Sequence, residues 1–71
     1  MEKILRYTKH SIERKDERDI SENEIKETLE NPDYTLTQSD DRKIRVKMIG
    51  NRIINVVYKE EKSTIIIITV Y

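Results

Sequence analysis

Three side chains that can act on a phosphate group recur every four residues near the N-terminus: His10, Arg14 and Arg18. On an α-helix, residues four apart lie next to one another on the same side. Guanidinium groups donate paired hydrogen bonds that match phosphate oxygens, and an imidazole exchanges a proton near neutral pH. The spacing therefore predicts an anion site on one face of a helix, with RNA phosphate as the favoured ligand.

Cleavage of RNA without a metal needs a group that takes the 2′-hydroxyl proton, a cation beside the phosphate, and an acid for the leaving oxygen. His10 has the chemistry of the base or the acid, and Arg14 and Arg18 have that of the phosphate-binding cations. Tyr71 is a candidate second proton carrier or base-stacking ring. We assign Arg45, Lys47 and Thr69 to substrate binding, with the two cations extending a basic track for the RNA backbone.

Each candidate also has a structural interpretation that stays open. His10 suits a capping or packing role at a helix start, and the two arginines stand among acidic residues that offer surface ion pairs. Arg45 and Lys47 alternate with apolar residues, which is typical of the solvent face of an amphipathic strand. Tyr71 is equally compatible with a core or edge aromatic, and Thr69 with an ordinary strand position.

Length and composition restrict the class of protein. The chain has 71 residues, which allows one domain spanning 1–71. It has no cysteine and one histidine, so we expect no cofactor and no metal. It also lacks an apolar run long enough for a bilayer and the apolar stretch of a signal peptide, which favours a soluble cytoplasmic protein without a membrane partner.

The net charge is zero, but the charges are segregated along the chain. Residues 21–41 hold seven acidic residues and one lysine, whereas residues 42–52 hold five basic residues and no acidic one. Such a distribution allows a local basic surface on a neutral protein. A solvated mixture of charges, without a binding role, explains the same pattern.

Local patterns predict two helices. Residues 4–8 form either a short leading strand or an extended arm, and Thr8 or Ser11 caps the first helix, with Ile12 as its buried residue. Ser21 and Glu24 have the spacing of a capping box for the second helix. That helix ends at Asn31, because the residue before a proline avoids helical angles.

Four strands are predicted after the helices, at residues 34–38, 43–49, 52–58 and 64–71. In the second of these, Ile44, Val46 and Met48 alternate with basic residues, which predicts a buried apolar face and a solvent-facing basic one. The uninterrupted run Ile65–Ile68 indicates a central strand covered on both faces, unless a dimer covers it. The predicted fold class is α+β, with two N-terminal helices packed on one face of a four-stranded antiparallel sheet.

The order of these features resembles that of the domain of unknown function family 4258. The residues that carry the resemblance run from His10 to Tyr71: His10, Arg14, Arg18, Ile20, Ser21, Glu24, Ile25, Pro32, Thr69 and Tyr71. The chain departs from the pattern at Asp19, where such sequences commonly have glycine. The family is similar in layout to the small RelE, ParE and BrnT type toxins, many of which cleave RNA without a metal.

Two functions follow as expectations. The resemblance implies a ribonuclease toxin of a toxin–antitoxin pair, with an antitoxin protein and RNA as partners. The alternative is a non-catalytic binding or dimerisation module, in which the histidine and arginines are structural and a homodimer forms. The surroundings of the His10 ring discriminate between them, since a buried ring bonded to a carbonyl favours the structural role.

Overall fold

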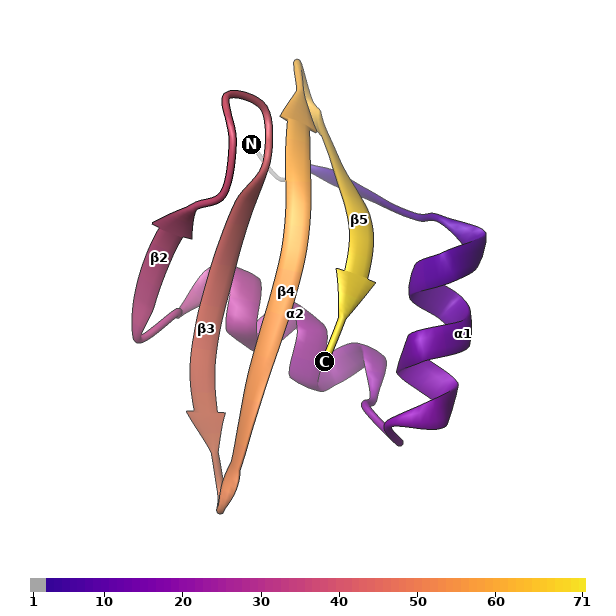
Figure 1. The fold of residues 1–71 in the computed structure, drawn as a ribbon, viewed down its shortest axis with the longest axis vertical. Coiled ribbons are helices and arrows are strands. Elements are labelled where there is room, and N and C mark those ends of the chain that lie inside the picture. The colour runs from indigo at the N-terminus through magenta and orange to yellow at the C-terminus, as the bar shows by residue number, and fades with distance from the viewer. Residues whose placement is uncertain (1–2) are drawn as a thin grey trace.

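Two helices and one five-stranded sheet make up residues 3–71, the part of the chain that the computed structural model describes (Figure 1). The elements in chain order are β1 (Ile4–Tyr7), α1 (Lys9–Glu17), α2 (Glu22–Glu30), β2 (Tyr34–Thr37), β3 (Lys43–Ile49), β4 (Arg52–Glu61) and β5 (Thr64–Val70). The strand order in the sheet is β1-β5-β4-β3-β2. Neither described helix is long and apolar enough to cross a membrane.

The prediction of a four-stranded antiparallel sheet is wrong, because the residues before α1 form a fifth strand parallel to β5. Leu5 lies opposite Ile65 and Tyr7 opposite Ile67, while the other neighbouring strands are antiparallel. Leu5 and Tyr7 pack against the core, so β1 gains apolar contacts as well as backbone hydrogen bonds. The pairing also places β5 between β1 and β4, which confirms that the run Ile65–Ile68 is central.

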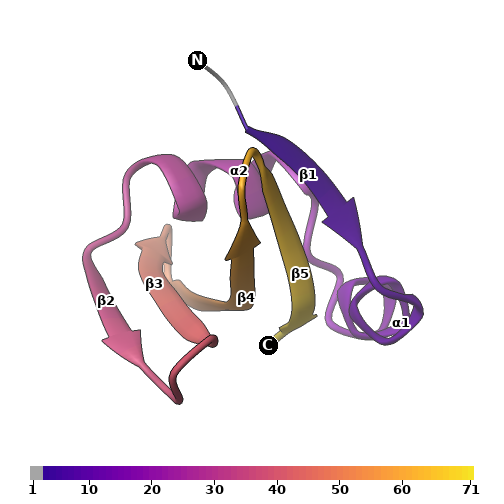
Figure 2. The same cartoon turned by 90° about the horizontal axis from the view of Figure 1, so that it is seen from above.

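Both predicted caps are present. The Thr8 hydroxyl accepts a hydrogen bond from the Ser11 amide at 3.1 Å, and Ser21 and Glu24 form the complete capping box. Ile12, however, is exposed, and the buried residue of α1 is Ser11. Figures 1 and 2 show α1 beside β5 at the border of the sheet, where a small side chain on the contact side allows close approach.

The main core lies between α2 and one face of the sheet (Figure 2). Ile25 and Leu29 of α2 pack there with Ile20, which precedes the helix, and with residues of the two central strands. These strand residues are Ile54, Val56, Tyr58, Ile65, Ile67 and Val70. Each fully buried aliphatic side chain contributes about 1.5–3 kcal/mol to folding before the ordering cost is subtracted.

The predicted orientation of β3 is reversed. Arg45 lies opposite Val56 and Lys47 opposite Ile54, and residues directly opposite in an antiparallel pair share one face of the sheet. The two cations therefore point to the side of α2. Ile44, Val46 and Met48 occupy the other face, which no described helix covers, so the expected coverage of the run Ile65–Ile68 on both faces is also wrong.

Candidate functional site

The residues of the predicted anion site lie on α1 and at its C-terminal end. His10 is in the first turn and is exposed, Arg14 is half-buried, and Arg18 is the exposed C-cap residue. Among the described residues, the side chains of His10 and Arg18 have no hydrogen-bond or ion-pair partner. Arg14 has a loose ion pair, with its Nη1 atom 3.8 Å from Oε2 of Glu17. The His10 ring is therefore neither buried nor bonded to a carbonyl.

The helical rise separates the three side chains along the axis of α1. At about 1.5 Å per residue, His10 and Arg14 are about 6 Å apart along the axis, and His10 and Arg18 about 12 Å. One phosphate group is smaller than the spacing between His10 and Arg18. His10 and Arg14 can therefore share a phosphate, whereas Arg18 is placed for a neighbouring part of a longer ligand.

Two further candidates lie on the strand beside α1. Thr69 of β5 is half-buried and lies opposite Val57, and Tyr71 directly follows the strand with 45% of its surface exposed. Tyr71 is held by its backbone, which exchanges hydrogen bonds of 2.8 and 3.0 Å with Asn55. The strand as a whole packs against α1, and the Thr8 hydroxyl at the start of the helix donates to the Ile68 carbonyl at 3.0 Å. No hydrogen bond or ion pair within residues 3–71 joins either side chain to the cluster on α1.

Arg45 is engaged inside the fold. Its Nη1 atom donates to the backbone carbonyl of Leu29, in the last turn of α2, and its guanidinium carbon lies 5.1 Å from the centre of the Tyr58 ring. The last carbonyls of a helix lack partners within the helix and carry partial negative charge. Arg45 therefore satisfies the C-terminal end of α2 and takes a structural position.

The Lys47 side chain also has a partner within the fold. Its Nζ atom lies 3.8 Å from Oδ1 of Asp33, and the other carboxylate oxygen accepts a 2.8 Å hydrogen bond from the Met48 amide. Asp33 follows the proline that ends α2, so these contacts fasten the chain between α2 and β2 to β3. We therefore leave Arg45 and Lys47 out of the proposed site.

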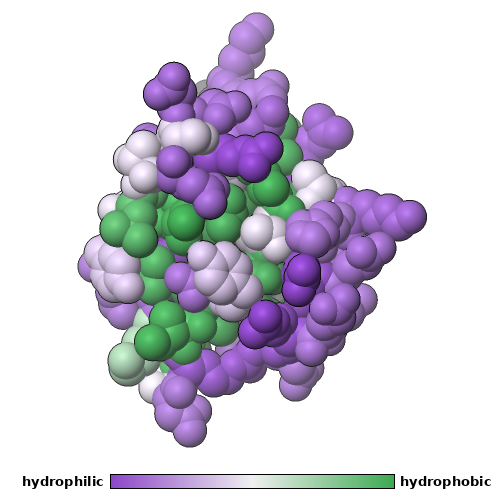
Figure 3. All heavy atoms as spheres, viewed as in Figure 1, coloured by the Kyte–Doolittle hydropathy of each residue, from purple (hydrophilic) through white to green (hydrophobic). Residues whose placement is uncertain are grey.

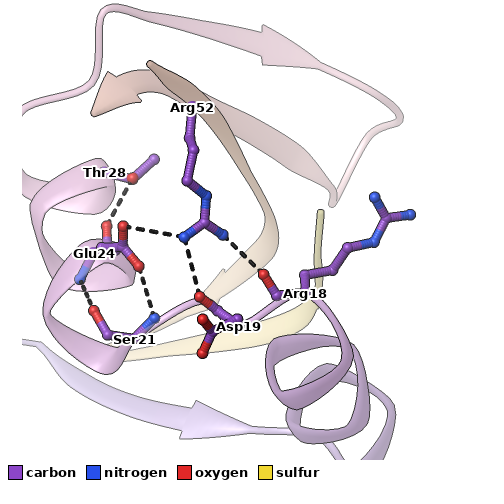
Figure 4. Close-up of polar contacts among 6 residues, drawn as sticks. All are labelled: Arg18, Asp19, Ser21, Glu24, Thr28 and Arg52. Carbon is purple, nitrogen blue, oxygen red and sulfur yellow. Dashed lines mark hydrogen bonds and ion pairs between the residues drawn. The ribbon is translucent and has the colours of Figure 1, made fainter. Parts of the chain in front are cut away.

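Arg52 makes the contacts that sequence reasoning missed (Figure 4). Its two terminal nitrogens donate to the backbone carbonyls of Arg18 at 2.8 Å and Asp19 at 3.1 Å, and Nη1 lies 3.7 Å from Oε2 of Glu24. A signal that could have indicated this cluster is Asp19, which has a positive φ of 54°. Such a turn exposes the last carbonyls of α1 to a donor.

The side chains of Arg52 and Arg18 point in different directions (Figure 4). The Arg18 carbonyl accepts from Arg52, but the Arg18 side chain points away from the cluster of polar contacts. The same residue therefore serves the fold through its backbone and leaves its guanidinium group exposed.

A hollow of about 810 Å³ lies elsewhere, between α2 and β1. Its lining includes Leu5, Tyr7, Leu29 and Ile65 together with four charged residues, and none of the predicted site residues. The Tyr7 hydroxyl is buried and has no hydrogen-bond partner within residues 3–71. Burial, and to a lesser degree the charge of Glu22, raise the pKa of Tyr7 above its ordinary value.

Comparison with known proteins identifies one family. A family model described as a domain of unknown function, DUF4258, matches residues 7–71. The chain belongs to this family. No curated protein and no solved structure matches it. Membership in the DUF4258 family confirms the resemblance stated from the sequence, whereas the likeness to RelE-type toxins stays a prediction.

Proposed function

We propose that this DUF4258 protein is a metal-independent ribonuclease and acts as the toxin of a toxin–antitoxin pair. The supporting observation is the different use of its cations. Arg45, Lys47 and Arg52 are bound to helix ends or to carboxylates of the fold. His10 and Arg18 have no such partner among the described residues, and Arg14 has only a loose one. These side chains, which the fold does not use, remain available for an anionic ligand.

In the proposed reaction, the 2′-oxygen of RNA attacks the adjacent phosphorus. The new bond joins phosphorus to the 2′-oxygen, the bond to the 5′-oxygen breaks, and the products carry a 2′,3′-cyclic phosphate and a 5′-hydroxyl. His10 takes the 2′-hydroxyl proton, and Arg14 stabilises the additional negative charge on the phosphate oxygens. Tyr71 donates a proton to the leaving 5′-oxygen, and Arg18 binds the neighbouring phosphate.

The test is cleavage of a single-stranded RNA by purified protein in EDTA. We expect His10→Ala and Arg14→Ala each to lower the rate at least about 100-fold, as is usual for loss of an acid–base group or of a transition-state charge contact. Lys9→Ala and Arg42→Ala are matched controls, since both remove an exposed cation outside the proposed site. Wild-type protein that leaves RNA intact, or controls that fall as far as the site variants, would refute the activity.

The toxin role needs a second measurement. Expression of the wild type is expected to slow bacterial growth, and expression of His10→Ala is not. Binding of RNA without cleavage, and without an effect on growth, would instead favour the non-catalytic binding module.

A further inference from the structure

The face of the sheet opposite α2, which we call the open face, carries an apolar surface. The register places on it Tyr34 and Leu36 of β2, Ile44, Val46 and Met48 of β3, Ile53 and Val57 of β4, Ile66 of β5 and Ile4 of β1. Figure 3 views the molecule from this side, and hydrophobic side chains gather there over the central strands. No described helix covers them.

The exposure of these residues is unusual for a chain of this size. Five large side chains on the open face are at least half exposed: Ile4 at 63%, Tyr34 at 55%, Leu36 at 50%, Met48 at 60% and Ile53 at 58%. Isolated exposed apolar residues are common on proteins, but a contiguous patch marks an interaction surface. Val46 and Val57, on the same face, are only 2% and 4% exposed. Neighbouring side chains bury these two residues within the single chain, so the exposed residues surround a buried centre.

We propose that a second copy of this chain covers the open face, so that two sheets pack face to face with α2 on the outside of each. Packed sheets of this kind lie about 10 Å apart, with side chains of both inner faces interdigitating. The proposal does not depend on ribonuclease activity, because α1, which carries His10 and Arg14, packs beside β5 and does not form the open face.

Charge favours a second copy as the occupant. The chain carries 14 basic and 14 acidic residues, so two copies have no net repulsion. The polar residues among the apolar ones on the open face are the neutral Asn55 and Thr69. Its charged residues, Arg6, Lys59 and Glu61, lie at one end, where Lys59 and Glu61 pair at 3.4 Å. Two open faces therefore meet without an unpaired charge at the centre.

The area of the open face is sufficient for a weak dimer. Five strands about 4.8 Å apart and about 22 Å long present a flat area of roughly 500 Å², so two copies together bury about 1,000 Å² or more. That value is at the lower limit for a specific interface, whereas a standard one buries about 800 Å² per partner. The total accessible surface of the chain is 4998 Å², so the contact takes roughly a tenth of it. We therefore expect a dissociation constant in the micromolar range.

Sedimentation equilibrium from about 1 to 300 µM tests the proposal. We expect the wild type to change from monomer to dimer over this range, and Ile53→Lys to weaken the dimer at least about 10-fold by burying a charge in it. Ile12→Lys is the matched control, because Ile12 is also an exposed isoleucine, 47% exposed, but lies on α1. It is expected to dimerise like the wild type.

Circular dichroism establishes that each variant is folded, and Met48→Glu replaces Ile53→Lys if the latter unfolds. A wild type that is monomeric at 300 µM overturns the proposal, and so does a dimer that a folded open-face variant leaves unchanged. The mass measurement is independent of RNA cleavage, so either proposal can fail alone.

Discussion

Replacing Arg52 with methionine tests the assignment of this residue as the donor that holds the turn between the helices. The substitution removes two hydrogen bonds from a cation, to the carbonyls of Arg18 at 2.8 Å and Asp19 at 3.1 Å. Hydrogen bonds to charged groups contribute about 1.5–3 kcal/mol each, but the side chain is 41% exposed, which lowers the contribution. The ion pair with Glu24, at 3.7 Å, adds less than about 1 kcal/mol. We expect the free energy of unfolding to fall by about 2 kcal/mol.

Urea denaturation followed by circular dichroism measures this change, at a protein concentration low enough to keep the chain monomeric. For a domain of this size, about 2 kcal/mol corresponds to a fall in melting temperature of roughly 8–16 °C. Arg42→Met is the control, because Arg42 is exposed in the turn between β2 and β3 and its side chain has no partner among the described residues. A change at Arg52 within about 0.5 kcal/mol of the control would refute the assignment.

Two further predictions concern the caps and the buried phenol. Ser21→Ala is expected to lower the free energy of unfolding by about 1 kcal/mol, because it breaks the capping box of α2. Ser63→Ala, in an exposed turn, serves as the control. Equal urea midpoints for the two variants would contradict the prediction. Burial raises the pKa of Tyr7, so the folded state keeps this proton at pH values where the unfolded chain loses it. The free energy of unfolding is therefore unaffected by Tyr7 below the usual tyrosine pKa of 10.0 and falls as the pH rises above it. We expect Tyr7→Phe to show a smaller decline in urea midpoint between pH 9 and 11 than the wild type, and identical slopes would contradict this.

The helix ends were predictable because their determinants are local. The Thr8 hydroxyl binds an amide three residues away, and Ser21 and Glu24 bind each other's amides within one turn. The parallel pairing of β1 was not predictable in the same way. This pairing joins Ile4 to Thr64, and the sequence around either residue contains no local pattern that predicts contact between the two segments.

The reversal of β3 has a different cause. Alternation assigns Ile44, Val46 and Met48 to one face and the basic residues to the other, but it does not say which face a helix covers. Here the covered side takes Arg45, because the carbonyl of Leu29 at the end of α2 needs a donor. Because no described helix covers this face, Met48 is 60% exposed, whereas Val46 is buried by its neighbours, as the alternation predicts.

Only the part of the candidate site that depends on helical geometry was predictable from the sequence. Spacing by four residues correctly indicated that His10 and Arg14 lie on one helix, and Arg18 is the C-cap residue of that helix. Whether a cation is free or engaged depends on carbonyls and carboxylates brought near by the fold, as Arg45 and Arg52 illustrate. Sequence alone therefore could not separate the cations of α1 from those that hold the helices.

The most direct test of the central claim, that α1 is the RNA-binding element, is an NMR titration of the uniformly ¹⁵N-labelled protein. The ligand is a short 2′-O-methyl RNA, which cannot be cleaved because its 2′-oxygen is blocked. We predict that the amide shifts concentrate in α1, from His10 to Arg18, and at Tyr71. Shifts confined to the open face or to the hollow beside Tyr7, or no shifts at millimolar RNA, would contradict the account.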